Sequence, residues 1–152
     1  MIKYAKITNQ ETGLCEVGIG TNAEFYKSLG MTPLDVQQSD IDGAWYLASM
    51  CPMKTDEQRE IEELARINSL TLDSSTFYKE VLRTSGKNVS DIQYLIQYNN
   101  ILSSTQKESL LIDLQKTFTF VRGSFFITTI GTLLNYTTED LNYLFENKVF
   151  SY

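Results

Sequence analysis

The sequence contains no histidine and only two cysteines, Cys15 and Cys51, among its 152 residues. Without histidine the chain lacks the usual general base near neutral pH, the commonest transition-metal ligand and any Ser-His or Cys-His catalytic pair. Two cysteines are too few for a four-cysteine zinc site or for a dense disulfide framework, so we interpret both as reduced, apolar thiols. We therefore expect no metal, no cofactor, no catalytic residue and no enzymatic activity; acid-base chemistry by paired carboxylates is the alternative left open.

Basic residues are also scarce, since 13 lysines and arginines face 19 acidic residues, for a net charge of −6. This charge repels phosphate backbones, so we expect no direct contact with nucleic acid and favour a basic protein surface as the partner. The longest apolar-rich stretch, residues 118–134, is interrupted by Arg122, Gly123, Ser124 and four threonines. Because it is too polar for a membrane span and the first five residues do not resemble a signal peptide, we expect a cytoplasmic protein without membrane contact.

The amino-terminal part shows alternation typical of strands. Residues 2–8 and 14–19 alternate on either side of the turn-forming segment 9–13, which predicts a β-hairpin. Asn22 is a suitable cap for a short helix that ends at Gly30.

A second hairpin is predicted where Asp42 and Gly43 separate two short runs, residues 35–39 and 44–48. This dipeptide favours a type I′ turn because both residues tolerate positive φ. Residues 1–52 are therefore predicted to form a small, four-stranded β-β-α-β-β module.

After this module the spacing of apolar residues becomes helical. A charged helix over about 55–69 is predicted within a linker, residues 53–70, and residues 71–152 are predicted to form an all-α bundle of about five short helices. The predicted fold class is thus α+β, with a small β-rich module followed by a helical bundle.

Capping signals place the helices of this bundle. Ser90 is expected to cap one helix, and a capping box at Ser103 and Gln106 is expected to open the longest one. The apolar spacing carries that helix to Val121, just before Gly123.

Two short motifs are better explained by structure than by chemistry. The turn containing Gly18 and Gly20 precedes a helix, where phosphate can bind, but no third glycine or P-loop lysine follows, so a structural turn is favoured. Residues 129–145 fit a helix-turn-helix pattern, yet the second helix would present Glu139 and Asp140 to DNA phosphates. We interpret this segment as a helical hairpin.

Two sets of residues are candidates for protein binding. Five carboxylates crowd the predicted linker helix, where Arg59 and Arg66 can pair with some of them. Such a run is either a solvated helix face or an acidic surface for a basic partner. Aromatic residues of the amino-terminal module are candidate interface anchors. The candidate residues are Asp56, Glu57, Glu60, Glu62 and Glu63 in the acidic run, and Phe25, Tyr26, Trp45 and Tyr46 among the aromatics.

Four segments of the first third carry a further pattern: KYAKI at 3–7, N-x-E-T-x-LCEVG at 9–18, GTN-x-x-FYKS-x-GMT at 20–32 and DG-x-WYL at 42–47. They resemble a short amino-terminal module of phage and prophage tail-region proteins, some of them similar to tail-fibre or tail assembly chaperone proteins. The resemblance implies no catalytic residue. It implies a non-catalytic, tail-associated assembly chaperone or structural adaptor.

Three later segments are similar to a helical module of proteins from the same genomic neighbourhood: FVRG at 120–123, IG-x-LL at 130–134 and T-x-x-DL-x-YLF at 137–145. The partner is then expected to be a phage tail component, in the cytoplasm of the bacterial host or on the virion. The same neighbourhood supports an alternative: an anti-CRISPR-like inhibitor that binds the basic nucleic-acid channel of a host CRISPR effector.

Overall fold

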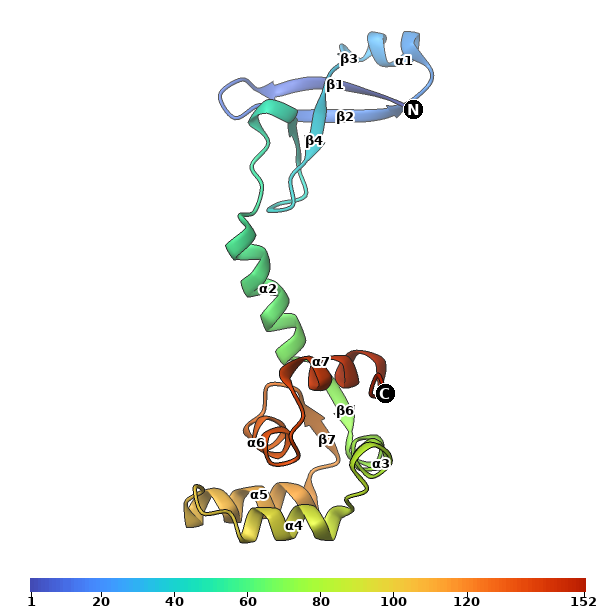
Figure 1. Ribbon diagram of the computed structural model, residues 1–152. Coiled ribbons are helices and arrows are strands. Elements are labelled where there is room, and N and C mark those ends of the chain that lie inside the picture. The colour runs from blue at the N-terminus through green and yellow to red at the C-terminus, as the bar shows by residue number, and fades with distance from the viewer. The chain divides into compact units, whose positions relative to one another are not determined.

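The computed structural model describes residues 1–152, and the chain divides into two compact units, residues 1–59 (unit 1) and 60–152 (unit 2). The elements comprise seven α-helices, a five-stranded antiparallel sheet in unit 1 and a second, two-stranded sheet in unit 2 (Figure 1). The predicted α+β class is confirmed, and unit 2 is mostly helical. None of the helices has the length and apolar character needed to cross a membrane.

Unit 1 begins with the predicted hairpin, strands β1 (Ile2–Asn9) and β2 (Leu14–Gly20). The side chain of Asn9 shapes the turn, because its Oδ1 accepts hydrogen bonds from the N–H groups of Glu11 (2.9 Å) and Thr12 (3.1 Å). Gly13 then adopts a φ of 71°, which glycine tolerates without strain. Local turn chemistry therefore fixes this hairpin.

Helix α1 (Ala23–Ser28) follows, capped by the side chain of Asn22 as predicted. After Gly30 comes β3 (Thr32–Pro33), which pairs with β1 and was not predicted. The sheet therefore has five strands rather than four, in the order β3-β1-β2-β5-β4. A two-residue strand gives no periodic signal, which explains the omission.

Strands β4 (Val36–Gln38) and β5 (Trp45–Leu47) form the second predicted hairpin, but the type I′ turn was wrong. Of Asp42 and Gly43, only the glycine has positive φ, at 74°. The loop is longer because side chains satisfy its main chain: Asp42 Oδ1 accepts from the Ala44 N–H (2.9 Å), and Ser39 Oγ accepts from the Ile41 N–H (3.1 Å). A 3-10 helix, η1 (Ala48–Met50), ends the hairpin.

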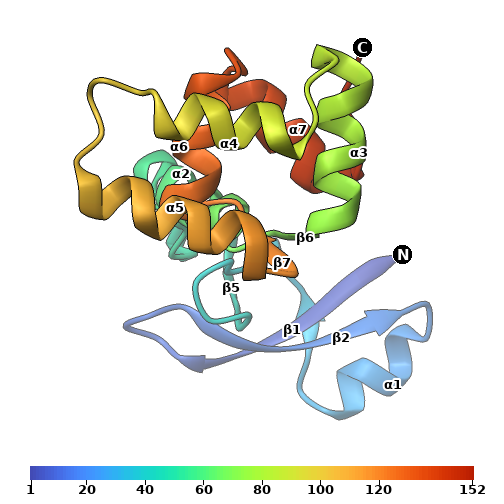
Figure 2. The same ribbon diagram turned by 90° about the horizontal axis from the view of Figure 1, so that it is seen from below.

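Helix α2 (Asp56–Asn68) carries the boundary between the units and confirms the helix predicted over 55–69. The other helices of unit 2 are shown in Figures 1 and 2, where α4 and α5 lie side by side. They are α3 (Ser74–Ser85), α4 (Val89–Gln97), α5 (Ser104–Lys116), α6 (Phe125–Leu133) and α7 (Thr138–Asn147).

The prediction of an all-α bundle was wrong in one respect, because β6 (Thr71–Asp73) pairs antiparallel with β7 (Thr119–Val121). The longest predicted helix ends at Lys116, and its expected last turns form β7 instead. Phe120 is buried between two exposed residues of β7, which is the alternation of a strand. A further small correction is that Asn88, not Ser90, caps α4.

The cores of the two units differ in size. Unit 1 has a small cluster of buried side chains, Ala5, Cys15 and Val36, with partly buried neighbours that include Trp45 and Leu47. Unit 2 has sixteen buried side chains in one cluster, among them Phe77, Ile130 and Phe145. Aromatic rings link its elements: Phe120 lies 5.3 Å from Phe77 and 4.6 Å from Phe126, measured between ring centroids.

Candidate protein-binding surfaces

Tyr26, one of the candidate anchors, is committed to internal contacts of unit 1. Its ring stacks on that of Tyr4 at 4.7 Å, and its hydroxyl donates a hydrogen bond to the Ile19 carbonyl at 3.0 Å. The ring lies against Gly18 and Gly20, where any Cβ atom would collide with it. The two glycines therefore make room for Tyr26, which is the structural role favoured for this turn.

Phe25 is the most accessible of the four candidate aromatics. It is 54% exposed and meets Tyr26 edge-on, with the ring centroids 5.2 Å apart. Leu29, four residues further on, is also about half exposed. Phe25 and Leu29 thus form a small apolar patch.

Trp45 and Tyr46 lie elsewhere in the sheet, so the structure does not bring the four aromatics together. Trp45 pairs with Cys15 near the start of β2, whereas Tyr26 covers Gly18 and Gly20 near its end. Trp45 packs on the core and is covered by the Lys3 ammonium, 4.8 Å from the ring centroid. Successive strand residues point to opposite faces, so Tyr46 points away from this core.

The Tyr46 hydroxyl donates a 2.7 Å hydrogen bond to Asp42 Oδ2. This bond raises the pKa of Tyr46, and together with the Ala44 N–H it lowers the pKa of Asp42. The hydrogen bond ties the Tyr46 hydroxyl to the hairpin loop rather than leaving it free for a partner.

The acidic run is exposed along α2, and arginines neutralise part of it. Arg59 forms a two-nitrogen hydrogen bond to Asp40 Oδ2 (2.8 and 3.2 Å) and lies 3.7 Å from Asp56. The guanidinium of Arg66 contacts Glu63 at 2.6 Å and lowers its pKa. It also bridges to Glu146 of α7 at 2.5 Å.

The two partners that the sequence did not reveal are Asp40 and Glu146, which are 19 and 80 residues from the arginines they bind. Helical spacing identifies only pairs within one helix. Contacts of this kind are therefore invisible in the sequence.

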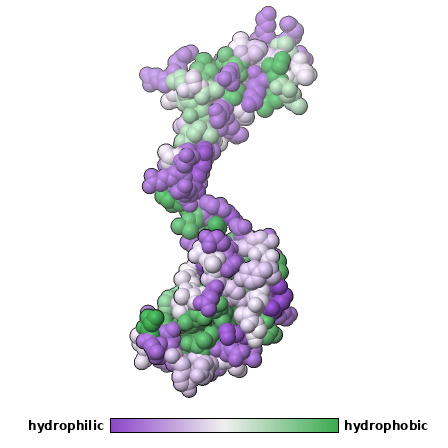
Figure 3. Space-filling model, viewed as in Figure 1, coloured by the Kyte–Doolittle hydropathy of each residue, from purple (hydrophilic) through white to green (hydrophobic).

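Glu57 and Glu60 make no hydrogen bond or ion pair. They share α2 with the exposed apolar residues Ile61 and Leu64, which are 61% and 59% accessible. Figure 3 shows hydrophilic side chains gathered over α2. The helix thus presents free carboxylates beside apolar side chains.

Unit 2 has an apolar groove that the sequence did not reveal. It has a volume of about 250 Å³ and is lined by residues of α6 and of the loop between α4 and α5. Ile101 at its edge is 92% exposed. The lining residues are Asn99, Ile101, Leu102, Thr128, Thr129, Thr132 and Leu133.

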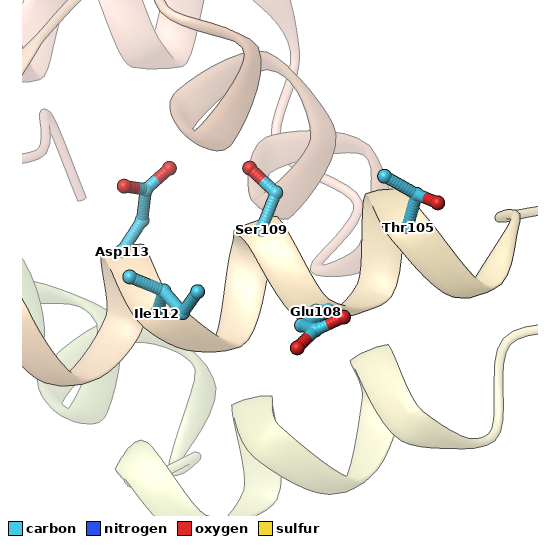
Figure 4. Close-up of a pocket in the computed structure, with 5 residues that line it drawn as sticks. All are labelled: Thr105, Glu108, Ser109, Ile112 and Asp113. Carbon is cyan, nitrogen blue, oxygen red and sulfur yellow. The ribbon is translucent and has the colours of Figure 1, made fainter.

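A second hollow, of about 260 Å³, runs along the outer face of α5 (Figure 4). All its lining residues belong to that one helix, so it is an open furrow rather than a pocket between elements. Glu108 and Asp113 place carboxylates near Ile112, which is 53% exposed. The other lining residues are Thr105 and Ser109.

Both cysteines are free thiols. Burial raises the pKa of Cys15, whose Sγ donates a hydrogen bond to the Gly13 carbonyl at 3.2 Å. Partial burial, with the charges of Asp40 and Asp42, raises the pKa of Cys51. A raised pKa disfavours the nucleophilic thiolate. No three Cys, Asp or Glu side chains are grouped as metal ligands would be.

No family model, curated protein or solved structure matches the chain. The similarity of residues 3–47 to a phage tail-region module therefore stays a prediction.

Proposed function

We propose that the chain is a non-catalytic, protein-binding protein, a tail-associated assembly chaperone or structural adaptor encoded by a phage. The supporting observation is the division into two compact units, each with its own core. Such a division allows one unit to bind a common partner and the other a variable one. The similarity to the tail-region module supplies the class of partner, a tail component in the host cytoplasm or on the virion.

The surfaces support binding through apolar groups. The groove beside Ile101 and the Phe25 patch expose large apolar side chains, which anchor many protein interfaces. Contacts of this kind do not depend on long-range charge and persist when salt is added.

The alternative is an anti-CRISPR-like inhibitor, for which α2 offers five carboxylates and two arginines. Its carboxylates would imitate a phosphate backbone and occupy a basic channel. The pairing of Glu63 with Arg66, and of Asp56 with Arg59, weakens this imitation. We therefore place the adaptor first.

Direct binding measurements separate the two functions. The purified chain is titrated with tail-fibre and baseplate proteins of the encoding phage and, in parallel, with a host CRISPR effector, at low and high salt. The adaptor predicts binding to a tail component that changes little with salt. Charge imitation predicts binding to the effector that weakens steeply, because the Debye length falls from about 30 Å at 0.01 M salt to about 3 Å at 1 M.

A matched pair of variants tests the role of the free carboxylates. Glu57→Gln with Glu60→Gln removes two charges from α2, and Glu11→Gln with Glu139→Gln removes two exposed charges elsewhere. Under the adaptor proposal both variants bind the tail component alike. Effector binding that only the α2 variant loses would overturn the proposal in favour of the inhibitor.

A further inference from the structure

Residues 149–152 (the docked segment) follow α7 and dock on α3. Lys148 ends α7 in the left-handed conformation, with φ at 64°, and so redirects the chain. The docked segment has no regular secondary structure, yet Phe150 is only 3% exposed. Side-chain contacts from α3 and from Tyr136, rather than main-chain pairing, therefore hold it in unit 2.

Two charged side chains of α3 bind the main chain of this segment. Glu80 Oε2 accepts a 2.9 Å hydrogen bond from the Phe150 N–H. Arg83 donates to the Tyr152 carbonyl at 2.6 Å and, more weakly, to the Phe150 carbonyl at 3.4 Å. Glu80 and Arg83 also pair with each other at 2.7 Å, which holds both in place.

One aromatic side chain completes the contact. The Phe150 ring stacks on Tyr136 with centroids 4.4 Å apart and belongs to the core cluster of unit 2. Val149 and Ser151 are exposed, so their side chains contribute little. The site thus binds the main chain of a segment without regular secondary structure and one buried ring, that of Phe150.

We propose that Glu80, Arg83 and Tyr136 form a peptide-binding socket, and that the docked segment occupies it until a partner's segment with an aromatic residue and no regular secondary structure displaces it. The charged pair binds N–H and C=O groups, which every peptide has, so the buried Phe150 ring is the main side-chain feature by which the socket selects its ligand. Because the docked segment competes, a partner's apparent affinity equals its intrinsic affinity for the open socket multiplied by the fraction of sockets that are open. The socket is argued from these contacts alone, so it does not depend on the proposed association with a phage tail.

The test uses full-length chains and two labelled peptides, acetyl-KVFSY and acetyl-KVASY, with fluorescence polarisation as the readout. Phe150→Ala vacates the socket without shortening the chain, and Val149→Ala is the matched control in the same segment. We expect Phe150→Ala to bind the phenylalanine peptide at least about tenfold more tightly than the wild type or the control does. The alanine peptide should not bind, and adding Arg83→Gln to Phe150→Ala should weaken binding by about tenfold or more.

Three results would overturn the proposal. The first is a folded Phe150→Ala chain, verified by circular dichroism, that binds the peptide no better than the wild type. The second is concentration-dependent dimers of the wild-type chain that Phe150→Ala abolishes, since the socket would then belong to a second copy. The third comes from hydrogen exchange of the wild type, which remains informative if Phe150→Ala does not fold. We expect the Phe150 amide to exchange at least about tenfold faster than the Val81 amide, and equal rates would show that the segment opens only with the core.

Discussion

Unit 1 and unit 2 are stabilised in different ways. Unit 1 has a core cluster of three small or medium side chains under a five-stranded sheet, whereas unit 2 packs sixteen buried side chains together. Burial of apolar surface is the dominant favourable term in folding, so we expect the core to stabilise unit 2 more than unit 1. Unit 1 depends more on strand pairing and on single close fits, such as the Tyr26 ring on Gly18.

The same difference appears at the surface. The aromatic residues of unit 1 mostly serve its own fold, as the Tyr26 and Tyr46 hydroxyls show by their hydrogen bonds within the unit. Unit 2 has enough core to leave Tyr94, Tyr98 and Ile101 exposed. Exposed apolar side chains are therefore informative about binding in unit 2, whereas in unit 1 they must first be separated from structural ones.

The largest effect is expected from Phe145→Ala in unit 2. Phe145 is fully buried, so its truncation leaves a cavity and should lower the free energy of unfolding by about 3–5 kcal/mol. Thermal and urea unfolding followed by circular dichroism measure this loss. Tyr143→Ala, at a 43% exposed position of the same helix, is the control and should cost far less. Equal losses would contradict the assignment of the core.

Gly18→Ala is expected to act on unit 1 alone. The added methyl group collides with the Tyr26 ring, and such overpacking costs about 1–3 kcal/mol. Amide hydrogen exchange should show faster opening of β1 and β2 with unchanged protection in α3. The control is the same substitution in a Tyr26→Ala background, where the ring is absent and the cost should disappear. A cost that persists there would show that the glycine serves another purpose.

Local signals predicted much of the fold, and non-local contacts were missed. The Asn9 turn, the Asn22 cap and the α2 periodicity each depend on a few neighbouring residues. The β6-β7 pair joins residues about fifty positions apart, and each strand is only three residues long, so no local pattern identifies it.

The candidate surfaces show the same limit. The five carboxylates were correctly expected on one exposed helix, but the aromatic set mixed structural with accessible residues. Only the fold shows that Tyr26 lies on two glycines while Phe25 beside it faces solvent. The contact between the docked segment and α3 was also missed, because Glu80 and Phe150 are 70 residues apart.

The smallest expected effect is a difference between the units at alkaline pH. Burial, with a further contribution from Asp113, raises the pKa of Tyr78 to about 12, and its hydroxyl donates a 3.0 Å hydrogen bond to the Leu114 carbonyl. In the unfolded chain a tyrosine ionises near pH 10, at about its ordinary pKa. The stabilisation from neutral Tyr78 is therefore fully present below about pH 10 and is lost as the pH rises towards about 12.

Urea unfolding of unit 2 measured between about pH 8 and pH 11.5 should show this alkaline decline, and Tyr78→Phe should flatten it because phenylalanine does not ionise. Tyr46 in unit 1 is the comparison, since its pKa is raised by the hydrogen bond to Asp42 rather than mainly by burial. Because that bond lies at the surface, where charges are screened, we expect Tyr46→Phe to change the pH dependence less than Tyr78→Phe. A larger effect from Tyr46→Phe would mean that a surface hydrogen bond stabilises unit 1 more than buried packing stabilises unit 2, and would reverse the comparison between them.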